Sequence, residues 1–160
     1  HLSERVEQAL DGLAALLPRK LRIVLSREPM RAGTGGALHH ARHLLDERFL
    51  LCNGDSLLDF NLATLLAAAR ADPPDVLGRI VVRRVEDGSR YGAVETSGDR
   101  VTAFLARPRS PEPAPGQINA GIYLLDRPVL DGIAPVCSLE RDVLPARAAR
   151  GVLRATLGSC

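Results

Sequence analysis

The sequence is poor in aromatic residues and nearly balanced in charge. It has no tryptophan, and aromatic residues make up 3% of its 160 residues. Proteins that bind single-stranded nucleic acid commonly stack bases on aromatic side chains, and this chain has few to offer. Its net charge of +2 is also far from the strongly basic balance of nucleic-acid-binding domains. These two shortages argue against a nucleic-acid partner.

Long hydrophobic runs and closely spaced cysteines are also missing. No apolar run approaches the roughly 20 residues that a helix needs to cross a bilayer, and the first residues, His1 to Arg5, lack the apolar core of a signal peptide. Cys52, Cys137 and Cys160 are far apart, so they give no zinc-binding spacing. This cysteine pattern favours a reducing compartment. We therefore expect a cytoplasmic protein with no membrane partner.

The sequence does contain enough apolar residues for a core. Its hydrophobic fraction is 46%, and 160 residues suit a single domain. Helical and strand-like segments alternate first and a hairpin-rich part follows, which predicts a three-layer α/β domain with a mixed sheet. Helices are expected at Ser3–Leu17, Ala37–Leu45, Asn61–Ala69 and Ser138–Ala149, and strands at Leu21–Leu25, Phe49–Cys52, Val76–Val82, Tyr91–Glu95, Val101–Leu105 and Ile118–Leu125.

A carboxylate follows a short apolar run in the first half of the chain. The run Phe49 to Cys52 ends in Asn53-Gly54, and Asp55 comes next. Such a run, bounded by turn residues, predicts a buried strand. Because ligands of open α/β sheets bind beyond the carboxyl ends of strands, we expect Asp55 past the end of a central strand, in a cleft. The alternative is an ordinary strand-to-loop turn, since Asn-Gly is common turn chemistry.

A glycine-rich segment, Gly33 to Gly36, lies between an expected strand and an expected helix. Glycines allow the backbone to approach a ligand closely, and the start of a helix offers free N–H groups. No Gly-Lys-Ser/Thr follows, so the segment is not a P-loop, and it does not match the dinucleotide fingerprint either. A tight turn into a helix is the alternative interpretation.

Five motifs follow one another along nearly the whole chain: Glu28-Pro29 with Gly33-Thr34-Gly35-Gly36-Ala37-Leu38; Asn53-Gly54-Asp55-Ser56; Arg90-Tyr91-Gly92-Ala93-Val94-Glu95; Ile118-Asn119-Ala120-Gly121-Ile122-Tyr123; and Ser138-Leu139-Glu140 with Asp142 and Pro145. Together and in this order they resemble the sugar-1-phosphate nucleotidyltransferase family. The first two motifs resemble most the heptose or mannose 1-phosphate guanylyltransferases of that family.

This resemblance implies a three-layer Rossmann-like nucleotidyltransferase fold with a mixed, mainly parallel sheet. It implies an enzyme that joins a nucleoside triphosphate to a sugar 1-phosphate, giving GDP-heptose or GDP-mannose and pyrophosphate. These two substrates are the expected partners, with GTP as the expected nucleotide and UTP as the alternative. Two anions must meet at the α-phosphorus, and the implied cofactor, Mg²⁺, would neutralise their charge.

The resemblance also implies a role for particular residues. Asp55 is implied as a catalytic residue and a ligand of Mg²⁺, and Arg107 as a catalytic residue at the sugar phosphate. Five residues would lie against the nucleotide: Gly33, Thr34, Gly35, Gly36 and Gly54. Four would line the sugar pocket: Tyr91, Gly92, Glu95 and Asn119. For Tyr91 and Glu95, an ordinary strand face is the alternative.

The sequence departs from the family pattern in three places. The glycine-rich signature with its Arg and Lys has no counterpart, and the late Asp-containing segment is not found. The Glu-Lys-Pro segment appears as Ala106-Arg107-Pro108, where arginine keeps the charge but not the compact ammonium geometry. We therefore expect residues 1–160 to form a nucleotidyltransferase domain that lacks both ends of its active site and turns over slowly or not at all. The alternative is a non-catalytic nucleotide-sugar-binding or assembly module; the oligomeric state is left open.

Overall fold

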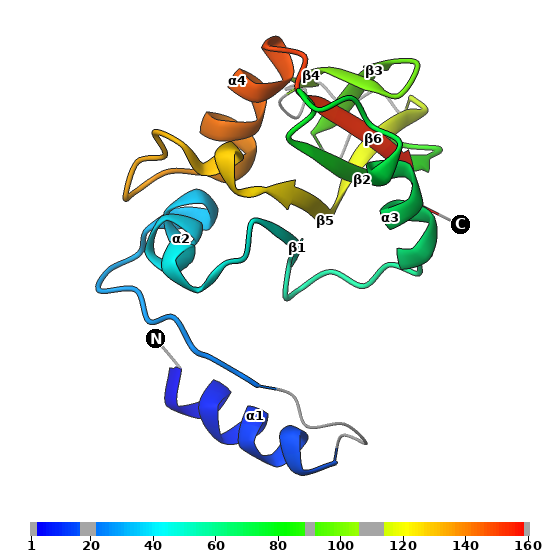
Figure 1. The fold of residues 1–160 in the computed structure, drawn as a ribbon. Helices are drawn as coiled ribbons and strands as arrows, with labels where there is room; N and C mark the ends of the chain where they lie inside the picture. Colours follow the sequence, from blue (N-terminus) through cyan, green and yellow to red (C-terminus); the bar gives the residue numbers. More distant parts are fainter. Residues whose placement is uncertain (1–2, 17–21, 89–91, 106–113, 159–160) are drawn as a thin grey trace.

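A computed structural model describes residues 3–16, 22–88, 92–105 and 114–158. Its centre is a six-stranded sheet in the order β1-β5-β2-β6-β4-β3 (Figure 1). The strands are β1 Arg48–Cys52, β2 Gly78–Val85, β3 Ala93–Ser97, β4 Arg100–Leu105, β5 Gly116–Asp126 and β6 Leu153–Leu157. The α-helices are α1 Ser3–Leu16, α2 Gly33–Ala41, α3 Leu62–Arg70 and α4 Leu144–Ala149, with a π-helical turn, η3, at Leu139–Val143 and 3₁₀ turns η1 Arg42–Leu44 and η2 Arg127–Leu130.

The sheet is mixed, as predicted, but its described pairings are not mainly parallel. Strand β5 runs between β1 and β2 and is antiparallel to both. Among the described strands only β2 and β6 form a parallel pair, while β3–β4, β3–β5 and β4–β6 are antiparallel. The prediction was wrong on this point because β5 returns between two strands that run the same way.

The expected strand at Leu21–Leu25 is also absent from its described residues, 22–25, which carry no strand. Ile23, Val24 and Leu25 are each at least 40% exposed. β-branched and apolar residues favour a strand only when a neighbouring strand and a packed face are available. These residues instead belong to an extended segment that connects α1 to the rest of the molecule (Figure 1).

The hydrophobic core occupies both faces of the sheet. The larger cluster joins buried residues of the strands, such as Ile80 and Tyr123, to Leu38 of α2, Leu139 of η3 and Leu144 of α4. The smaller cluster packs Leu65 and Ala69 of α3 against Val81, Ile122 and Leu124. Alternate residues of β2 and β5 thus enter different clusters, as the period of a strand requires. The helices α2 and α4 therefore lie on one face and α3 on the other.

Strand β5 carries an irregularity that shapes one end of the sheet. Ile80 of β2 pairs with Tyr123, but Val82 pairs with Asn119, so β5 has additional residues at this point. Gly121 lies inside the irregularity with φ of 74°, a left-handed conformation that favours glycine. β-bulges of this kind bend a strand and are frequent next to functional sites. The sheet also curls, because β3, the last strand of the order, pairs with β5 as well as with β4. The pairing with β5 joins Ala93 to Ile118.

The predicted helix cap at Asn61 is confirmed, and it can be tested by mutation. The side chain of Asn61 accepts a hydrogen bond from the Thr64 N–H at 3.1 Å, which caps α3. Replacing Asn61 by alanine is expected to destabilise the protein by about 1 kcal/mol, while Asn61→Gly should cost only a few tenths. Urea unfolding of the two variants checks this. Equal losses for both variants would contradict a capping role.

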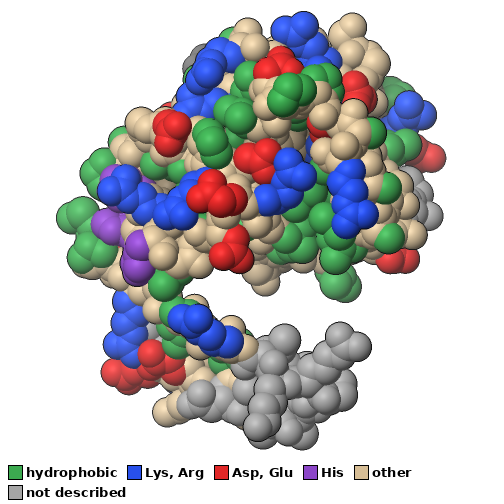
Figure 2. Space-filling view, in the orientation of Figure 1, with side chains coloured by type: hydrophobic (Ala, Val, Ile, Leu, Met, Phe, Trp, Pro, Cys, Tyr) green, Lys and Arg blue, Asp and Glu red, His purple; other side chains and the backbone are tan. Residues whose placement is uncertain are grey.

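The described part of the chain contains no helix long and apolar enough to cross a membrane. Figure 2 shows basic and acidic side chains interspersed over the face that it presents, in keeping with the net charge of +2.

Candidate functional site

The glycine segment is the first turn of helix α2 rather than a loop before it. The helix begins at Gly33, where a loop with a helix from Ala37 was predicted. The N–H groups of Gly35 and Gly36 both donate to the carbonyl oxygen of Cys137, at 3.0 and 3.1 Å. Because this carbonyl satisfies them, these two N–H groups are not free for a ligand in this structure.

Close packing against residues 135–139 explains why these positions are glycine. Gly33 has φ of 76°, and a Cβ there would lie 2.5 Å from the Cys137 carbonyl oxygen. A Cβ on Gly36 would lie 2.6 Å from the carbonyl oxygen of Pro135. Gly35 and Gly36 are buried, whereas Gly33 and Thr34 are exposed. The exposed half of this turn is the part that a ligand could reach.

A carboxylate from the π-helical turn η3 meets this first turn of α2. The hydroxyl of Thr34 donates to Oε2 of Glu140 at 2.7 Å and accepts from the N–H of Leu139 at 2.9 Å. Ser138 also donates its hydroxyl to Oε2 of Glu140, at 3.1 Å. Ser138 begins the turn, and its N–H is held by the carboxylate of Asp142 at 2.7 Å. Thr34 is therefore fixed from two sides by η3.

The same carboxylate reaches strand β5. Tyr123, which is fully buried, donates its hydroxyl to Oε1 of Glu140 at 3.4 Å. The tyrosine oxygen accepts a hydrogen bond from Nδ2 of Asn119 at 2.7 Å. Burial raises the pKa of Tyr123 well above its usual range. The phenol therefore keeps its proton at neutral pH and remains a donor toward Glu140.

Asn119 connects this cluster to the end of strand β1. Its Oδ1 accepts from the N–H of Gly121 at 3.0 Å, so the side-chain amide is held at both ends. The N–H of Asn53 donates to the carbonyl oxygen of Gly121 at 2.8 Å. Gly121 has a positive φ, and a Cβ there would also lie 2.7 Å from Nδ2 of Asn53, so the position favours glycine. The turn that carries Asp55 is thereby anchored to the irregular part of β5.

Asp55 lies in that turn, three residues after β1, and is exposed. The prediction of a central strand was wrong, because β1 is at the end of the described strand order and pairs only with β5. The carboxylate receives a hydrogen bond from the hydroxyl of Ser56 at 3.3 Å. Among the residues that the structure describes, no basic side chain pairs with this carboxylate, which suits Mg²⁺, since Mg²⁺ binds through one or two carboxylates together with waters and substrate phosphates. The donor chemistry of this turn fits one metal ligand.

The described residues place no ready-made cluster of metal ligands around Asp55. In residues 3–16, 22–88, 92–105 and 114–158, no three His, Cys, Asp or Glu side chains are grouped to hold a metal ion. Gly54, predicted at the nucleotide, is exposed beside Asp55. Asp55 and Thr34 are not in direct contact; the hydrogen bonds through Glu140, Tyr123, Asn119 and Gly121 connect their turns.

The other predicted sugar-pocket residues are only partly described. Gly92 lies next to Ala93, and Asn119 lies next to Ile118, with which Ala93 pairs, so the curl of the sheet brings Gly92 and Asn119 together. Glu95 is exposed on β3 and follows Val94, whose side chain is in the larger core cluster. Successive strand residues alternate faces, so Glu95 points away from the core face on which Tyr123 lies. Tyr91 and Arg107 are outside the described residues.

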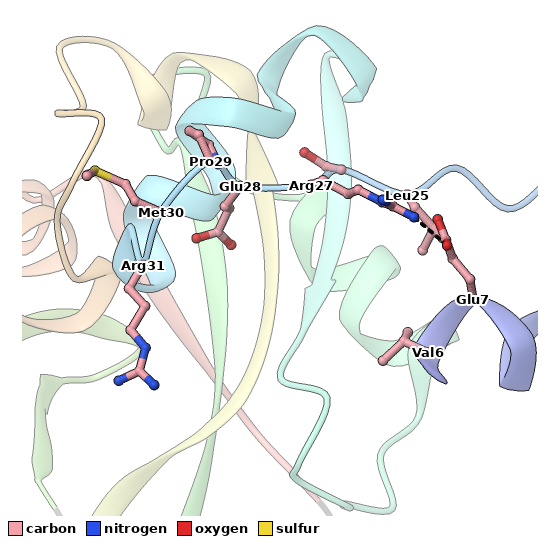
Figure 3. A pocket seen from close by; sticks show the side chains of 9 residues that line it. Val6, Glu7, Leu25, Arg27, Glu28, Pro29, Met30 and Arg31 are labelled. Carbon is pink, nitrogen blue, oxygen red and sulfur yellow. Dashed lines mark hydrogen bonds and ion pairs between the residues drawn. The ribbon is translucent and has the colours of Figure 1, made fainter. Parts of the chain in front are cut away.

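A further hollow lies away from these residues, beside α1. It has a volume of about 540 Å³ and lies between α1 and the extended segment that ends before α2 (Figure 3). Glu7 of α1 forms an ion pair with Arg27 across it. Val6 and Met30 in its wall are more than half exposed. None of the predicted site residues lines this hollow.

Comparison with known proteins gives one consistent family. A model of the nucleotidyl transferase family matches residues 3–143. The chain is 36% identical over 149 residues to a mannose-1-phosphate guanylyltransferase of Mycobacterium tuberculosis, covering 91% of this chain and 40% of that protein. It is 35% identical over 134 residues to the mannose-1-phosphate guanylyltransferase catalytic subunit beta of Dictyostelium discoideum, covering 81% and 36%. The chain thus spans about two fifths of the length of these relatives.

Solved structures agree with this result at the level of the fold. HddC from Yersinia pseudotuberculosis, in a complex with GMP-PN, superimposes with a TM-score of 0.74 at 23% identity, covering 94% of this chain and 64% of that chain. A second HddC structure from the same organism gives a TM-score of 0.76. The family model, which matches most of the chain, and the shared fold lead to one conclusion: this chain belongs to the nucleotidyl transferase family.

Proposed function

We propose that this chain is the substrate-binding part of a sugar-1-phosphate guanylyltransferase. The complete enzyme would form a nucleotide sugar, GDP-mannose or GDP-heptose, and pyrophosphate from GTP and the sugar 1-phosphate. The observation that carries the proposal is the 36% identity to a mannose-1-phosphate guanylyltransferase over 91% of the chain. The complex of HddC with GMP-PN supports a guanine nucleotide. A three-layer Rossmann-like fold for the complete enzyme and a cytoplasmic location are parts of the same proposal.

The chemistry requires that two anions meet and that a third anion leaves. An oxygen of the sugar phosphate forms a bond to the α-phosphorus of the nucleotide, and the bond to pyrophosphate breaks. A bound Mg²⁺ ion would neutralise charge on the phosphate oxygens. Asp55 supplies the carboxylate that would hold it, and its exposure leaves room for phosphate and water ligands.

Each substrate has a proposed side of the site. The nucleotide would lie against the exposed positions Gly33, Thr34 and Gly54, while Gly35 and Gly36 contribute by packing against residues 135–139. The sugar would lie near Asn119 and Gly92, which the curl of the sheet brings together. Polar side chains there would hydrogen-bond sugar hydroxyls. Tyr91 and, at the phosphate, Arg107 complete the proposal. Glu95, also expected here, points away from the face on which Tyr123 lies and is left out of it.

The experiment is a pyrophosphate-release assay on the complete protein that contains this chain. GTP, UTP, ATP and CTP are each paired with mannose 1-phosphate, heptose 1-phosphate and glucose 1-phosphate, in the presence of Mg²⁺. We expect the highest kcat/KM with GTP and either mannose or heptose 1-phosphate. The proposal would be overturned if pyrophosphate were released without a sugar phosphate, or if no pair of substrates gave pyrophosphate.

A second candidate is a non-catalytic nucleotide-sugar-binding or assembly module. The observation that favours it is the segment Ala106-Arg107-Pro108, in which the expected acidic and lysine side chains are replaced. Isothermal titration with GDP-mannose distinguishes the two candidates. Tight binding of the product together with an absence of turnover in the same preparation would support the module and exclude the enzyme.

A further inference from the structure

One carboxylate, that of Glu140, receives hydrogen bonds from its own turn η3 and from two other elements, α2 and β5. We call Thr34, Ser138, Glu140 and Tyr123 the Glu140 cluster. Thr34 belongs to the first turn of α2, Ser138 begins the turn η3, and Tyr123 belongs to β5. Their three hydroxyl groups converge on the two oxygens of Glu140, at 2.7, 3.1 and 3.4 Å. None of these contacts is required by the helices or the sheet themselves.

The directions of these hydrogen bonds are set by their surroundings. The Thr34 oxygen already accepts from the N–H of Leu139, and the Tyr123 oxygen already accepts from Nδ2 of Asn119. Both hydroxyl protons are therefore directed at Glu140. A carboxylate suits this arrangement because both of its oxygens are acceptors, whereas an amide presents one acceptor and one NH₂ donor. Glutamate is the side chain that satisfies all three hydroxyls.

Thr34, at one end of the Glu140 cluster, lies on the proposed nucleotide side of the site, and Tyr123, at the other end, lies next to the proposed sugar side. Thr34 is on the exposed half of the α2 turn, where the nucleotide is proposed to lie. Tyr123 orients Asn119, the proposed sugar residue, whose Oδ1 is held by the N–H of Gly121. Gly121 in turn holds Asn53, two residues before Asp55. A shift of Glu140 would therefore move both substrate-facing sides relative to each other.

We propose that Glu140 is a positioning residue that keeps the nucleotide side and the sugar side of the site in register. This inference rests on the proposed function for its catalytic consequence. Glu140 acts through Thr34 and Tyr123, not on a reacting atom. Its location in a π-helical turn agrees with such a role, because π-helical turns are frequently found at functional sites.

The kinetic test uses three substitutions in the complete protein. Glu140→Gln is expected to raise KM for both GTP and the sugar 1-phosphate by about tenfold while kcat changes by less than about threefold, since a lost charged hydrogen bond weakens positioning. Thr34→Val should raise KM for GTP only, and Tyr123→Phe should raise KM for the sugar 1-phosphate only. A merely structural role would instead lower kcat in proportion to active protein and leave both KM values unchanged.

The matched control is Asp142→Asn. Asp142 is in the same turn and binds the N–H of Ser138, but it contacts neither Thr34 nor Tyr123. It should therefore alter the stability of η3 and leave both KM values unchanged. If Asp142→Asn and Glu140→Gln raised KM equally, or if Glu140→Gln affected only one substrate, the positioning role would be overturned.

A measurement without substrates separates this inference from the proposed function. Amide hydrogen exchange of Glu140→Gln is expected to increase at Leu139, which donates to Thr34, and also at Gly121, which donates to Asn119. Asp142→Asn should increase exchange at Ser138 alone. If the complete protein proved inactive but Glu140→Gln increased exchange at both Leu139 and Gly121, the proposed function would be wrong. The structural connection through Glu140 would still be supported. Unchanged exchange at Gly121 would refute the connection whatever the activity.

Discussion

Asp55→Asn in the complete protein is expected to lower Mg²⁺-dependent pyrophosphate release by on the order of 10²–10³-fold, the usual effect of losing one electrostatic contact to the transition state. A carboxylate offers full negative charge to a cation, and an amide offers only a dipole. Asp55 is exposed, and its hydrogen-bond partner within the described part of the chain is the exposed Ser56, so the substitution removes no buried contact there. The fold should therefore remain intact while turnover is lost.

The measurement is steady-state pyrophosphate release as a function of Mg²⁺ concentration, with circular dichroism as the control for folding. Asp59→Asn is the matched control, because Asp59 is another exposed aspartate in the segment that leads to α3. It should retain normal turnover. If Asp55→Asn also kept near-normal turnover at the same Mg²⁺ concentration, Asp55 would be a turn residue and the proposed metal ligand would be wrong.

Arg79→Ala is expected to lower the free energy of unfolding by about 3–5 kcal/mol, because it leaves a buried charge without its partner. Arg79 is 8% exposed, and two of its nitrogens contact the two carboxylate oxygens of Asp72 at 2.6 and 2.7 Å. It also donates to Asp99, at 3.0 Å, and to the carbonyl oxygen of Ala155, at 3.2 Å. These contacts join β2 to the end of α3, to the β3–β4 turn and to β6.

Urea unfolding of the complete protein measures this loss, and Arg48→Ala is the matched control. Arg48 forms a comparable two-contact pair with Asp126, but its side chain is 45% exposed. Exposed pairs contribute about 0–1 kcal/mol, so the control should unfold nearly like the wild type. The double replacement Arg79→Met with Asp72→Leu should recover much of the loss, because it removes both charges. Equal effects of Arg79→Ala and Arg48→Ala would contradict the importance of burial.

The sequence predicts those parts of the fold that depend on local patterns. The apolar run before Asn53 forms β1, Asn61 caps α3 as expected, and the turn at Gly98 joins β3 and β4 into the predicted hairpin. In each case the deciding interactions lie within a few residues of one another. The placement of Asp55 in a turn beyond a strand follows from the same kind of signal.

Features that depend on distant partners could not be predicted in this way. The short strand β6 was missed, and residues 22–25 have the composition of a strand without a neighbouring strand in the described structure. The glycines of α2 are required by residues 135–139, about a hundred positions away. Glu140 was noticed only as part of a motif, because its partner Thr34 is 106 residues distant. No local periodicity carries that information.

The most direct test of the central claim follows the α-phosphorus of the nucleotide. The complete protein is incubated with Mg²⁺, GTP labelled at the α-phosphorus and either mannose 1-phosphate or heptose 1-phosphate, and the products are separated and counted. The proposed guanylyltransferase predicts that with one of the two sugars the label moves into GDP-mannose or GDP-heptose and that the pyrophosphate formed in equal amount is unlabelled. Label recovered only in GMP or GDP, with both sugar phosphates unconsumed, would contradict it.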